Sequence, residues 1–530
     1  MDSDDRLSIE QKLEEIQQLK AEVSDGNRPE AVEQRRESGA LTTRERIDHL
    51  CDDNSFEEVG KLVSPMPSTP ETYDWTREDA PADGLVAGVG EIDGTPVSIA
   101  ANDFTVKGGS VGNTGNKKIQ RVLDIAVRNG HPVILLMEGT GGRIEEGLDS
   151  RAFAQGDNVG IFDRLTKLSG WAPIVCAILG PGFGAPTNFS ALADYVVMHS
   201  ERGSMGIVGP PLIRAGLGTD VEYEDFDAEF HTRETGMADR AFETEEACLD
   251  SITTFLSHFP KNADGQPPVD EGYEQPYTDD VEALIDVVPS NPKKGYDIHG
   301  VLDGIVDRNS LYELKPNFAR NIVTGFARIE GQPIGIVANN PRFLAGSLDV
   351  NATHKTARFI SLCDAFDLPI VFLADTPGFM PGLDSEREAI ARHGAKVLYE
   401  LSRATTPILN VTIRRAYGLG YFAMAGGETV DNELRAVWPS AEIAVMGIDG
   451  AVDVAYRREI EAADDPKQKR QEIIDKFTDR TGPVRAAEHF GVDKVLDPRE
   501  TRKVVSRVLA RSSSRNPDGW PSKKHGVTPI

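Results

Sequence analysis

Short apolar runs recur along the chain and alternate with segments whose apolar residues follow helical spacing. Three runs in the first half begin at Pro96, Pro132 and Pro173, each about 40 residues after the previous one. Between the first two, residues 117–129 place apolar side chains at the three- and four-residue steps of an amphipathic helix. Nearly continuous apolar strands that alternate with helices are typical of sheets buried on both faces. The pattern therefore predicts an α/β fold.

The same pattern occurs twice in the chain. Pro96 and Pro132 recur as Pro333 and Pro369, both 237 positions later. This period is far longer than that of a solenoid or propeller repeat, so it indicates a duplicated domain. Two similar domains present two similar sites, which suits chemistry between two bound partners.

We expect domains at residues 1–270 and 285–530, in agreement with a length of 530 residues. The stretch 262–296 is rich in Pro, Gly, Asp and Asn and is expected to link them. Residues 6–25 predict an amphipathic helix that makes a packing or oligomer contact.

Composition excludes several classes of protein. The chain is 39% hydrophobic and 27% charged, as expected for a globular protein with a core, and no apolar run approaches the length of a membrane span. Its acidic first residues do not resemble a signal peptide. The four cysteines are scattered without metal-ligand or disulfide spacing, so we expect no metal and a reducing cytoplasm. A net charge of −28 argues against nucleic acid as a partner.

Glycine-rich corners follow the predicted strands and are the candidate sites. In the first repeat these corners are residues 138–147 and 180–186, and their counterparts are residues 375–382 and 415–421. Glycine lets another group approach the backbone, and the first N–H groups of the next helix have no acceptor within that helix. Two such donors stabilise an oxyanion that develops on a carbonyl, at about 2.7–4 kcal/mol per donor. A single corner of this kind is usually a tight turn, but matching corners in a duplication favour paired oxyanion sites.

Pro186 narrows the choice of donors at the first of these helix starts. Proline has no N–H, so the donors there are expected to be Gly184 and Ala185. The chain has no Gly-x-Ser-x-Gly or His-Glu-x-x-His signature of a nucleophile or metalloprotease. Glu145 and Glu146 follow a glycine turn and are either a catalytic pair or the acidic start of a helix.

Motifs spread over nearly the whole chain resemble the carboxyltransferase (β) subunits of biotin-dependent acyl-CoA carboxylases, such as propionyl-CoA carboxylase. The motifs that carry the resemblance are residues 102–110, 141–147, 377–382, 392–396 and 438–447. The resemblance implies two tandem crotonase-like (ββα spiral) domains. It also implies a homo-oligomer, usually a hexamer built as a trimer of dimers, with each active site between the first domain of one subunit and the second domain of its partner.

The resemblance further implies a reaction. The first domain would hold the acyl-CoA and the second the carboxybiotin. No side-chain base is needed in this family, because the ureido oxyanion of biotin takes the α-proton and the resulting enolate captures CO₂. The chain lacks the Met-Lys-Met signature of a biotinylated lysine and any obvious ATP-binding module. It is therefore expected to work with separate biotin carboxylase and biotin carboxyl carrier partners.

Position by position, the resemblance implies two sets of site residues. The oxyanion donors would be Gly184, Ala185, Leu419 and Gly420. The residues that bind substrate would be Gly141, Gly142, Arg143, Phe183, Tyr417 and Phe422. Leu419 replaces a glycine of the family, and Phe422 replaces an Asp or aliphatic residue that helps set acyl preference, so the acyl group stays open.

Three alternative functions remain open from the sequence. One is a biotin-linked decarboxylase of a carboxyacyl-CoA, which uses the same corners in the reverse direction. A second is a non-catalytic paralogue that scaffolds a carboxylase complex. A third is a biotin-independent hydrolase or isomerase, which would need Glu145 or Glu146 as an acid or base.

Overall fold

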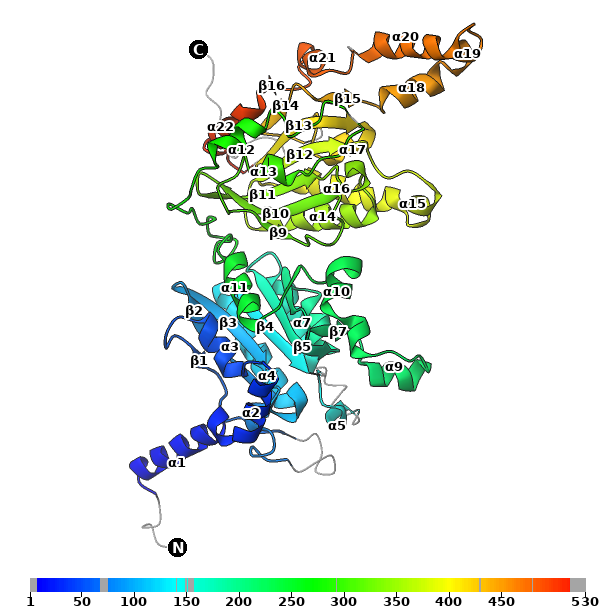
Figure 1. The fold of residues 1–530 in the computed structure, drawn as a ribbon. Coiled ribbons are helices and arrows are strands. Elements are labelled where there is room, and N and C mark those ends of the chain that lie inside the picture. The colour runs from blue at the N-terminus through cyan, green and yellow to red at the C-terminus, as the bar shows by residue number, and fades with distance from the viewer. Residues whose placement is uncertain are drawn as a thin grey trace, which may run out of the picture. The chain divides into compact units, whose positions relative to one another are not determined.

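The chain divides into two compact units. Unit 1 is Met1–Gly265 and unit 2 is Gln266–Ile530. The structure is a computed structural model, and it describes residues 7–66, 75–139, 141–147, 150, 157–291, 293–428, 430–478 and 480–514. Within these residues each unit contains one eight-stranded sheet with helices packed against it (Figure 1).

The sheet of unit 1 has the strand order β1-β2-β3-β4-β5-β6-β8, and the short strand β7 pairs with β5. Its strands are β1 Glu57–Glu58, β2 Leu85–Ile92, β3 Thr95–Asn102, β4 Val133–Gly139, β5 Ile174–Phe183, β6 Tyr195–His199, β7 Ser204–Gly206 and β8 Arg240–Phe242. Its helices are α1 Ile9–Glu22, α2 Pro29–Glu37, α3 Thr43–Leu50, α4 Asn113–Asn129, α5 Ile144–Gly147, α7 Asp157–Leu168, α8 Ala185–Ser190, α9 Pro210–Leu217, α10 Ala228–Phe230 and α11 Glu245–Leu256.

The sheet of unit 2 has the corresponding order β16-β14-β13-β12-β11-β10-β9, with β15 paired to β13. Its strands are β9 Tyr312–Leu314, β10 Ile322–Ile329, β11 Gln332–Asn339, β12 Ile370–Thr376, β13 Ile408–Tyr417, β14 Leu434–Val437, β15 Glu442–Ala444 and β16 Lys494–Val495. Its helices are α12 Thr278–Ala283, α13 His299–Leu302, α14 Val350–Ala365, α15 Leu383–Arg387, α16 Ile390–Arg403, α17 Gly418–Ala423, α18 Ile448–Ala455, α19 Arg457–Glu461, α20 Pro466–Thr478, α21 Pro483–Glu488 and α22 Thr501–Leu509.

The two sheets are built in the same way. In each, an antiparallel hairpin (β2–β3, β10–β11) leads into parallel strands. Apolar side chains of these strands and of the covering helices form one core per unit, which includes Leu123 and Ile178 in unit 1 and Val371 and Trp438 in unit 2. Parallel strands end at the same edge of a sheet, so the corners after β4 and β5 meet, as do those after β12 and β13. The predicted α/β fold is confirmed.

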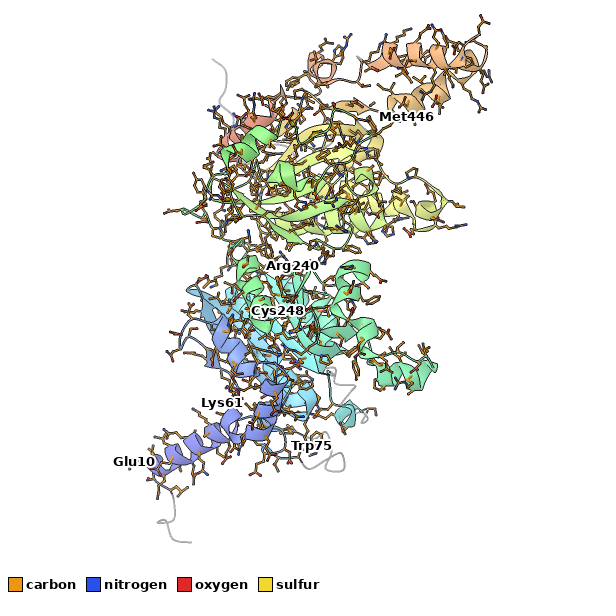
Figure 2. The ribbon with its side chains drawn as sticks, viewed as in Figure 1. Glu10, Lys61, Trp75, Arg240, Cys248 and Met446 are labelled. Atoms are coloured by element: carbon orange, nitrogen blue, oxygen red, sulfur yellow. The ribbon has the colours of Figure 1, made fainter. Side chains whose placement is uncertain are left out.

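The predicted linker and the predicted N-terminal helix have different outcomes in the structure. The stretch 262–296, predicted as a linker, forms helix α12 and contributes Leu284 and Tyr296 to the core of unit 2. Its composition makes the backbone irregular, but single apolar side chains still anchor it. The predicted N-terminal helix forms as α1 with a capping box at Ser8, and none of its residues is buried. Figure 2 shows Glu10 on this helix, which projects from the rest of unit 1.

Within the part of the chain that the structure describes, no helix is long and apolar enough to cross a membrane.

Candidate active site

The first corner joins β5 to helix α8 through Gly184. Gly184 has φ +74° and ψ −116°, a conformation that side chains with a Cβ rarely adopt, so glycine is required here. Helix α8 begins at Ala185, and Pro186 occupies its first turn. The first N–H groups of a helix have no acceptor within it, so Ala185 presents its N–H at this corner.

Gly184 does not offer a second donor. Its N–H donates to the carbonyl oxygen of Gly206 in strand β7, at 2.9 Å. The prediction that Gly184 supplies an oxyanion N–H is therefore corrected, because that N–H already holds the corner to the neighbouring strand. Since Pro186 has no N–H, Ala185 is the remaining donor of the predicted pair.

The loop after β4 lies directly against this corner. A Cβ built on Gly141 would lie 3.0 Å from the Ala185 N atom and 3.2 Å from the Phe183 carbonyl oxygen, so only glycine allows this approach. The Val111 N–H donates to the Gly141 carbonyl at 2.9 Å and fixes the loop. A Cβ on Gly142 would meet no atom within 4 Å. Gly141 thus faces the corner, and Gly142 faces open space.

The second corner repeats this arrangement in unit 2. Helix α17 begins at Gly418, which has φ +55°, and its next residues are Leu419 and Gly420. A Cβ built on Gly420 would lie 2.6 Å from the Cα of Gly378 in the loop after β12. That loop is fixed by the Leu348 N–H, which donates to the Gly378 carbonyl at 3.0 Å. Here the residue after Leu419 is a glycine with an N–H, whereas the first corner has Pro186 at that place.

Each unit therefore carries a backbone corner at the end of its parallel strands, with a glycine loop packed on a helix start. The pattern of the carboxyl transferase domain matches residues 34–528 of this chain.

The chain belongs to the carboxyl transferase domain family.

Known proteins resemble this carboxyl transferase over its full length. It is 40% identical to the propionyl-CoA carboxylase carboxyltransferase subunit of Haloferax mediterranei, over 99% of this chain and 100% of that protein. It is 37% identical to the methylmalonyl-CoA decarboxylase subunit alpha of Veillonella parvula, over 99% and 100%. The crystal structure of transcarboxylase 12S, a hexamer solved with methylmalonyl-CoA bound, superposes with a TM-score of 0.88 at 36% identity, over 99% of both chains. This match confirms the prediction of two tandem crotonase-like domains.

The side chain of Arg143 in this carboxyl transferase is engaged inside unit 1. It is 5% exposed and forms ion pairs with Asp83 and with Glu146, the latter at 3.3 Å. Glu146 also accepts the Asn113 N–H at 2.7 Å. The guanidinium therefore fixes the loop and is not exposed for the substrate contact predicted at Arg143. Glu146 is held in the same cluster, which does not suit a free acid or base, whereas Glu145, the other candidate for a hydrolase, is exposed.

Phe183 and Tyr417 end the two equivalent strands but differ in their surroundings. Phe183 is 2% exposed and packs edge-on against Tyr223 and Phe226, with ring centroids 5.3 and 6.0 Å away. The Tyr417 hydroxyl donates to a Glu442 carboxylate oxygen at 2.6 Å. Burial, and then Glu442, raise the pKa of Tyr417 well above its ordinary value. Both rings support their corners from within the fold.

Leu419 and Phe422 present side chains outward from helix α17. Leu419 is 53% exposed and Phe422 is 41% exposed. Phe422 lies beside Tyr421, with ring centroids 5.5 Å apart. Of the predicted substrate-binding side chains, Phe422 is the one whose exposure suits direct contact with a ligand.

A buried carboxylate stands just before the glycine loop in each unit, and sequence reasoning missed both. Glu138 pairs with Arg35 at 2.6 Å and Arg46 at 2.8 Å. Burial opposes ionisation of Glu138, but Arg46 and Arg35 outweigh it and hold its pKa below the ordinary value. Asp375, 237 positions later, pairs with Arg414 and Arg415, each at 2.8–2.9 Å. The constant offset of two acids at the ends of apolar strands was the available signal.

Among the described residues of this carboxyl transferase, no cluster of three or more His, Cys, Asp or Glu side chains is placed to hold a metal ion.

Proposed function

We propose that this chain is the carboxyltransferase subunit of an acyl-CoA carboxylase. It moves the carboxyl group of carboxybiotin, borne on a separate carrier protein, to the α-carbon of an acyl-CoA. The observation that carries this proposal is the match of the carboxyl transferase domain to residues 34–528, joined to a backbone corner of the same build in each unit. The relative from Haloferax mediterranei, named for propionyl-CoA, makes a short acyl-CoA the first substrate to test.

The reaction needs two oxygens to gain negative charge, and each corner suits one of them. In unit 1 the Ala185 N–H, beside the open space at Gly142, would bind the thioester oxygen as the acyl-CoA becomes an enolate. In unit 2 the N–H groups of Leu419 and Gly420 would bind the ureido oxygen of biotin. Biotin, when bound there, supplies the carboxyl group and the base, and the chain contributes position and charge stabilisation.

The fit to these ligands rests on glycines that keep space open. A Cβ on Gly142 in unit 1 or on Gly382 in unit 2 would meet no atom within 4 Å. Close to the helix starts, Gly141 and Gly378 lie against Ala185 and Gly420, so the loop backbone shapes each site. Because these glycines are alike in the two units, the assignment of the acyl-CoA to unit 1 and of carboxybiotin to unit 2 rests on the family resemblance.

A decarboxylase is the second candidate. The methylmalonyl-CoA decarboxylase subunit of Veillonella parvula is 37% identical to this chain, close to the 40% of the carboxylase relative. The same corners serve both directions, because an enolate forms in each. The direction is decided by the partner that carries biotin.

We further propose that the chain works as a homohexamer with biotin carboxylase and biotin carboxyl carrier partners. Transcarboxylase 12S, which superposes over 99% of both chains, assembles as a hexamer. A cytoplasmic location stays our prediction and is supported by four cysteines that are all free thiols, three of them buried.

The reverse half-reaction tests the proposal without any partner protein. The purified chain is incubated with malonyl-, methylmalonyl- or longer carboxyacyl-CoA and excess free biotin, and decarboxylated acyl-CoA is followed by mass spectrometry. Biotin-dependent turnover supports the proposal and identifies the acyl group. Turnover that does not need biotin contradicts it in favour of a hydrolase or isomerase. Silence with every thioester, despite binding, favours a non-catalytic scaffold.

A matched pair of variants tests the second corner directly. Leu419→Pro removes one N–H at a helix start, where proline is tolerated, and Leu419→Ala keeps that N–H while trimming the side chain. We expect turnover to fall about 10²–10³-fold in Leu419→Pro and to persist in Leu419→Ala. Equal turnover in the two variants would remove Leu419 from the oxyanion site.

A further inference from the structure

Strand β7 holds the first corner in place although it is only three residues long. On one edge it pairs with β5, with Gly182 opposite Met205 and Phe183 opposite Gly206. The Gly206 carbonyl accepts the Gly184 N–H at 2.9 Å. The orientation of Ala185, the next residue, therefore depends on where β7 lies.

The other edge of β7 carries a backbone bridge between Ser204 and Asp227 and, next to it, a hydrogen bond from a histidine side chain. His231 lies in a turn of π-helix (His231–Thr235) and is 6% exposed. Its Nε2 atom is 2.8 Å from the Met205 carbonyl oxygen, and its Nδ1 atom is 3.1 Å from the Thr235 hydroxyl oxygen. A carbonyl only accepts, so Nε2 carries the proton and donates to Met205. Burial lowers the pKa of His231 and favours this neutral ring.

The same segment also covers Phe183 with aromatic rings. Phe226 lies edge-on to Phe183 at 6.0 Å, Phe230 follows at 6.4 Å from Phe226, and the His231 ring is 5.0 Å from Phe230. A Cβ on Gly206 would lie 3.0 Å from the Phe183 ring, so β7 and this ring are in close contact. His231 thus joins the covering segment to the strand that positions the corner.

Unit 2 holds its equivalent strand in another way. The outer edge of β15 donates the Ile443 N–H to the Thr481 carbonyl at 3.0 Å, a bond between backbones. A substitution cannot remove that bond without changing the backbone. In unit 1 the hydrogen bond to the Met205 carbonyl comes from one side chain, so mutation can remove it while the backbone bridge between Ser204 and Asp227 remains.

We propose that His231 is a positioning residue for the first corner: by donating to Met205 it fixes β7, and through Gly206 it sets the direction of the Ala185 N–H. This inference rests on the proposed function of that N–H as a donor to the thioester oxygen. His231 touches no reacting atom. Its loss should therefore lower kcat more than it raises KM for the thioester.

The test compares three variants of the full chain. His231→Leu removes both ring bonds, and His231→Gln keeps an N–H at similar reach. His131→Leu is the matched control, since His131 is also buried in unit 1 but precedes the opposite, amino end of β4. Hydrogen exchange of the peptides containing Gly184 and Gly206 is followed by mass spectrometry, together with kcat and KM in the biotin-dependent half-reaction.

We expect faster exchange at Gly184 and a kcat lower by about 10–100-fold in His231→Leu, because small displacements of a donor have effects of this size. His231→Gln should restore both, and His131→Leu should change neither. Unchanged exchange at Gly184 in His231→Leu overturns the inference, whatever the turnover. Faster exchange with unchanged kcat also overturns it. If the wild-type chain itself shows no biotin-dependent turnover, the proposed function fails, and the exchange data alone decide whether His231 positions the corner.

Discussion

Helix α4 of unit 1 and helix α14 of unit 2 each bury a lysine at the same place in the repeat, 237 positions apart. Lys118 and Lys355 are both 4% exposed. Each ammonium donates to backbone carbonyls of the segment that leads into the first long strand of its unit. The acceptors are Ala82 and Leu85 for Lys118, and Lys315, Phe318 and Ile322 for Lys355. This part of the skeleton is the same in the two units.

The charges packed around that skeleton differ. Glu138 of unit 1 is neutralised by Arg35 and Arg46, which come from the N-terminal helices α2 and α3. Asp375 of unit 2 is neutralised by residues of the adjacent strand β13. The repeated backbone therefore sets the position of the buried carboxylate in each unit, whereas its counter-charge comes from a different neighbouring segment in each.

The largest expected effect is on stability, and it follows from removing the buried carboxylate of unit 1. Glu138→Gln keeps the shape of the side chain but leaves Arg35 and Arg46 without their shared carboxylate. Removing one partner of a buried ion pair lowers the free energy of unfolding by about 3–5 kcal/mol. Urea unfolding of the variant and of the wild-type chain measures this loss of free energy. The control is Glu45→Gln, because Glu45 pairs with Arg36 at the surface, and it should lose about 1 kcal/mol or less. Equal losses in both variants would contradict the structural role of Glu138.

The two corners carry phenylalanines with opposite surroundings, which sharpens the comparison. Phe183→Ala empties a buried aromatic site and should lower the free energy of unfolding by about 3–5 kcal/mol. Phe422 is 41% exposed, so Phe422→Ala should cost about 1 kcal/mol or less. Thermal and urea unfolding of the two variants measure the difference. A large loss in Phe422→Ala would show that its ring is structural.

Gly420 tests how closely the loop and helix must approach in unit 2. In Gly420→Ala the new Cβ would meet the Gly378 backbone at 2.6 Å, so loop and helix must separate. We expect turnover to fall about 100-fold through displaced donors, with about 1–3 kcal/mol lost in stability. Gly450→Ala in helix α18 is the control, since its Cβ would meet no atom within 4 Å. Turnover that survives in Gly420→Ala would mean that the second corner tolerates movement.

Raising the pH into the alkaline range should have opposite effects on the stability of the two units. Burial lowers the pKa of Lys118 to about 8, below its ordinary 10.5, so the unfolded chain binds the extra proton and stability rises as pH increases between these values. In unit 2, the carboxylates of Glu313 and then Asp297 raise the pKa of His299 to about 9, above its ordinary 6.5. Its contribution is full below pH 6.5 and is lost as pH rises through 9.

Urea unfolding at pH 7, 8.5 and 10 checks both signs. Lys118→Met should no longer show the rise in unfolding free energy with pH, which amounts to about 1.4 kcal/mol for each unit of pKa shift. His299→Gln should no longer show the fall in unfolding free energy with pH. This fall is the smaller of the two effects, because the His299 side chain is 38% exposed and solvent screens its ion pairs. A variant that keeps the wild-type pH dependence would show that its residue is not the titrating group.

Much of the skeleton could be predicted from the sequence. The apolar runs after Pro132 and Pro173 became β4 and β5, because a strand buried on both faces needs a continuous apolar stretch. The glycines at Gly141 and Gly184 marked the corners, because both take positive φ values that other residues avoid.

The remaining features depend on contacts between distant residues. The Gly184 N–H is taken by Gly206 in a three-residue strand, which is too short for a recognisable pattern. Arg143 is buried against Asp83, 60 positions away, so its motif alone suggested a free side chain. The role of Leu419 as a donor is tested by its Pro and Ala variants, and that of Ala185 through the variants of His231.

The buried lysine that both units share also indicates how the chain arose. A buried ammonium held by backbone carbonyls is an unusual feature, and its presence at one offset in both halves is most simply inherited from a half-length ancestor. The features that differ, such as the hydrogen bond from His231 to β7 and Pro186 where the other half has Gly420, would then be later additions. On this view the half-length ancestor carried one such corner, and its duplication placed two identical corners in one chain. The two halves then came to differ through substitutions in the residues that surround each corner, while the corner itself was kept.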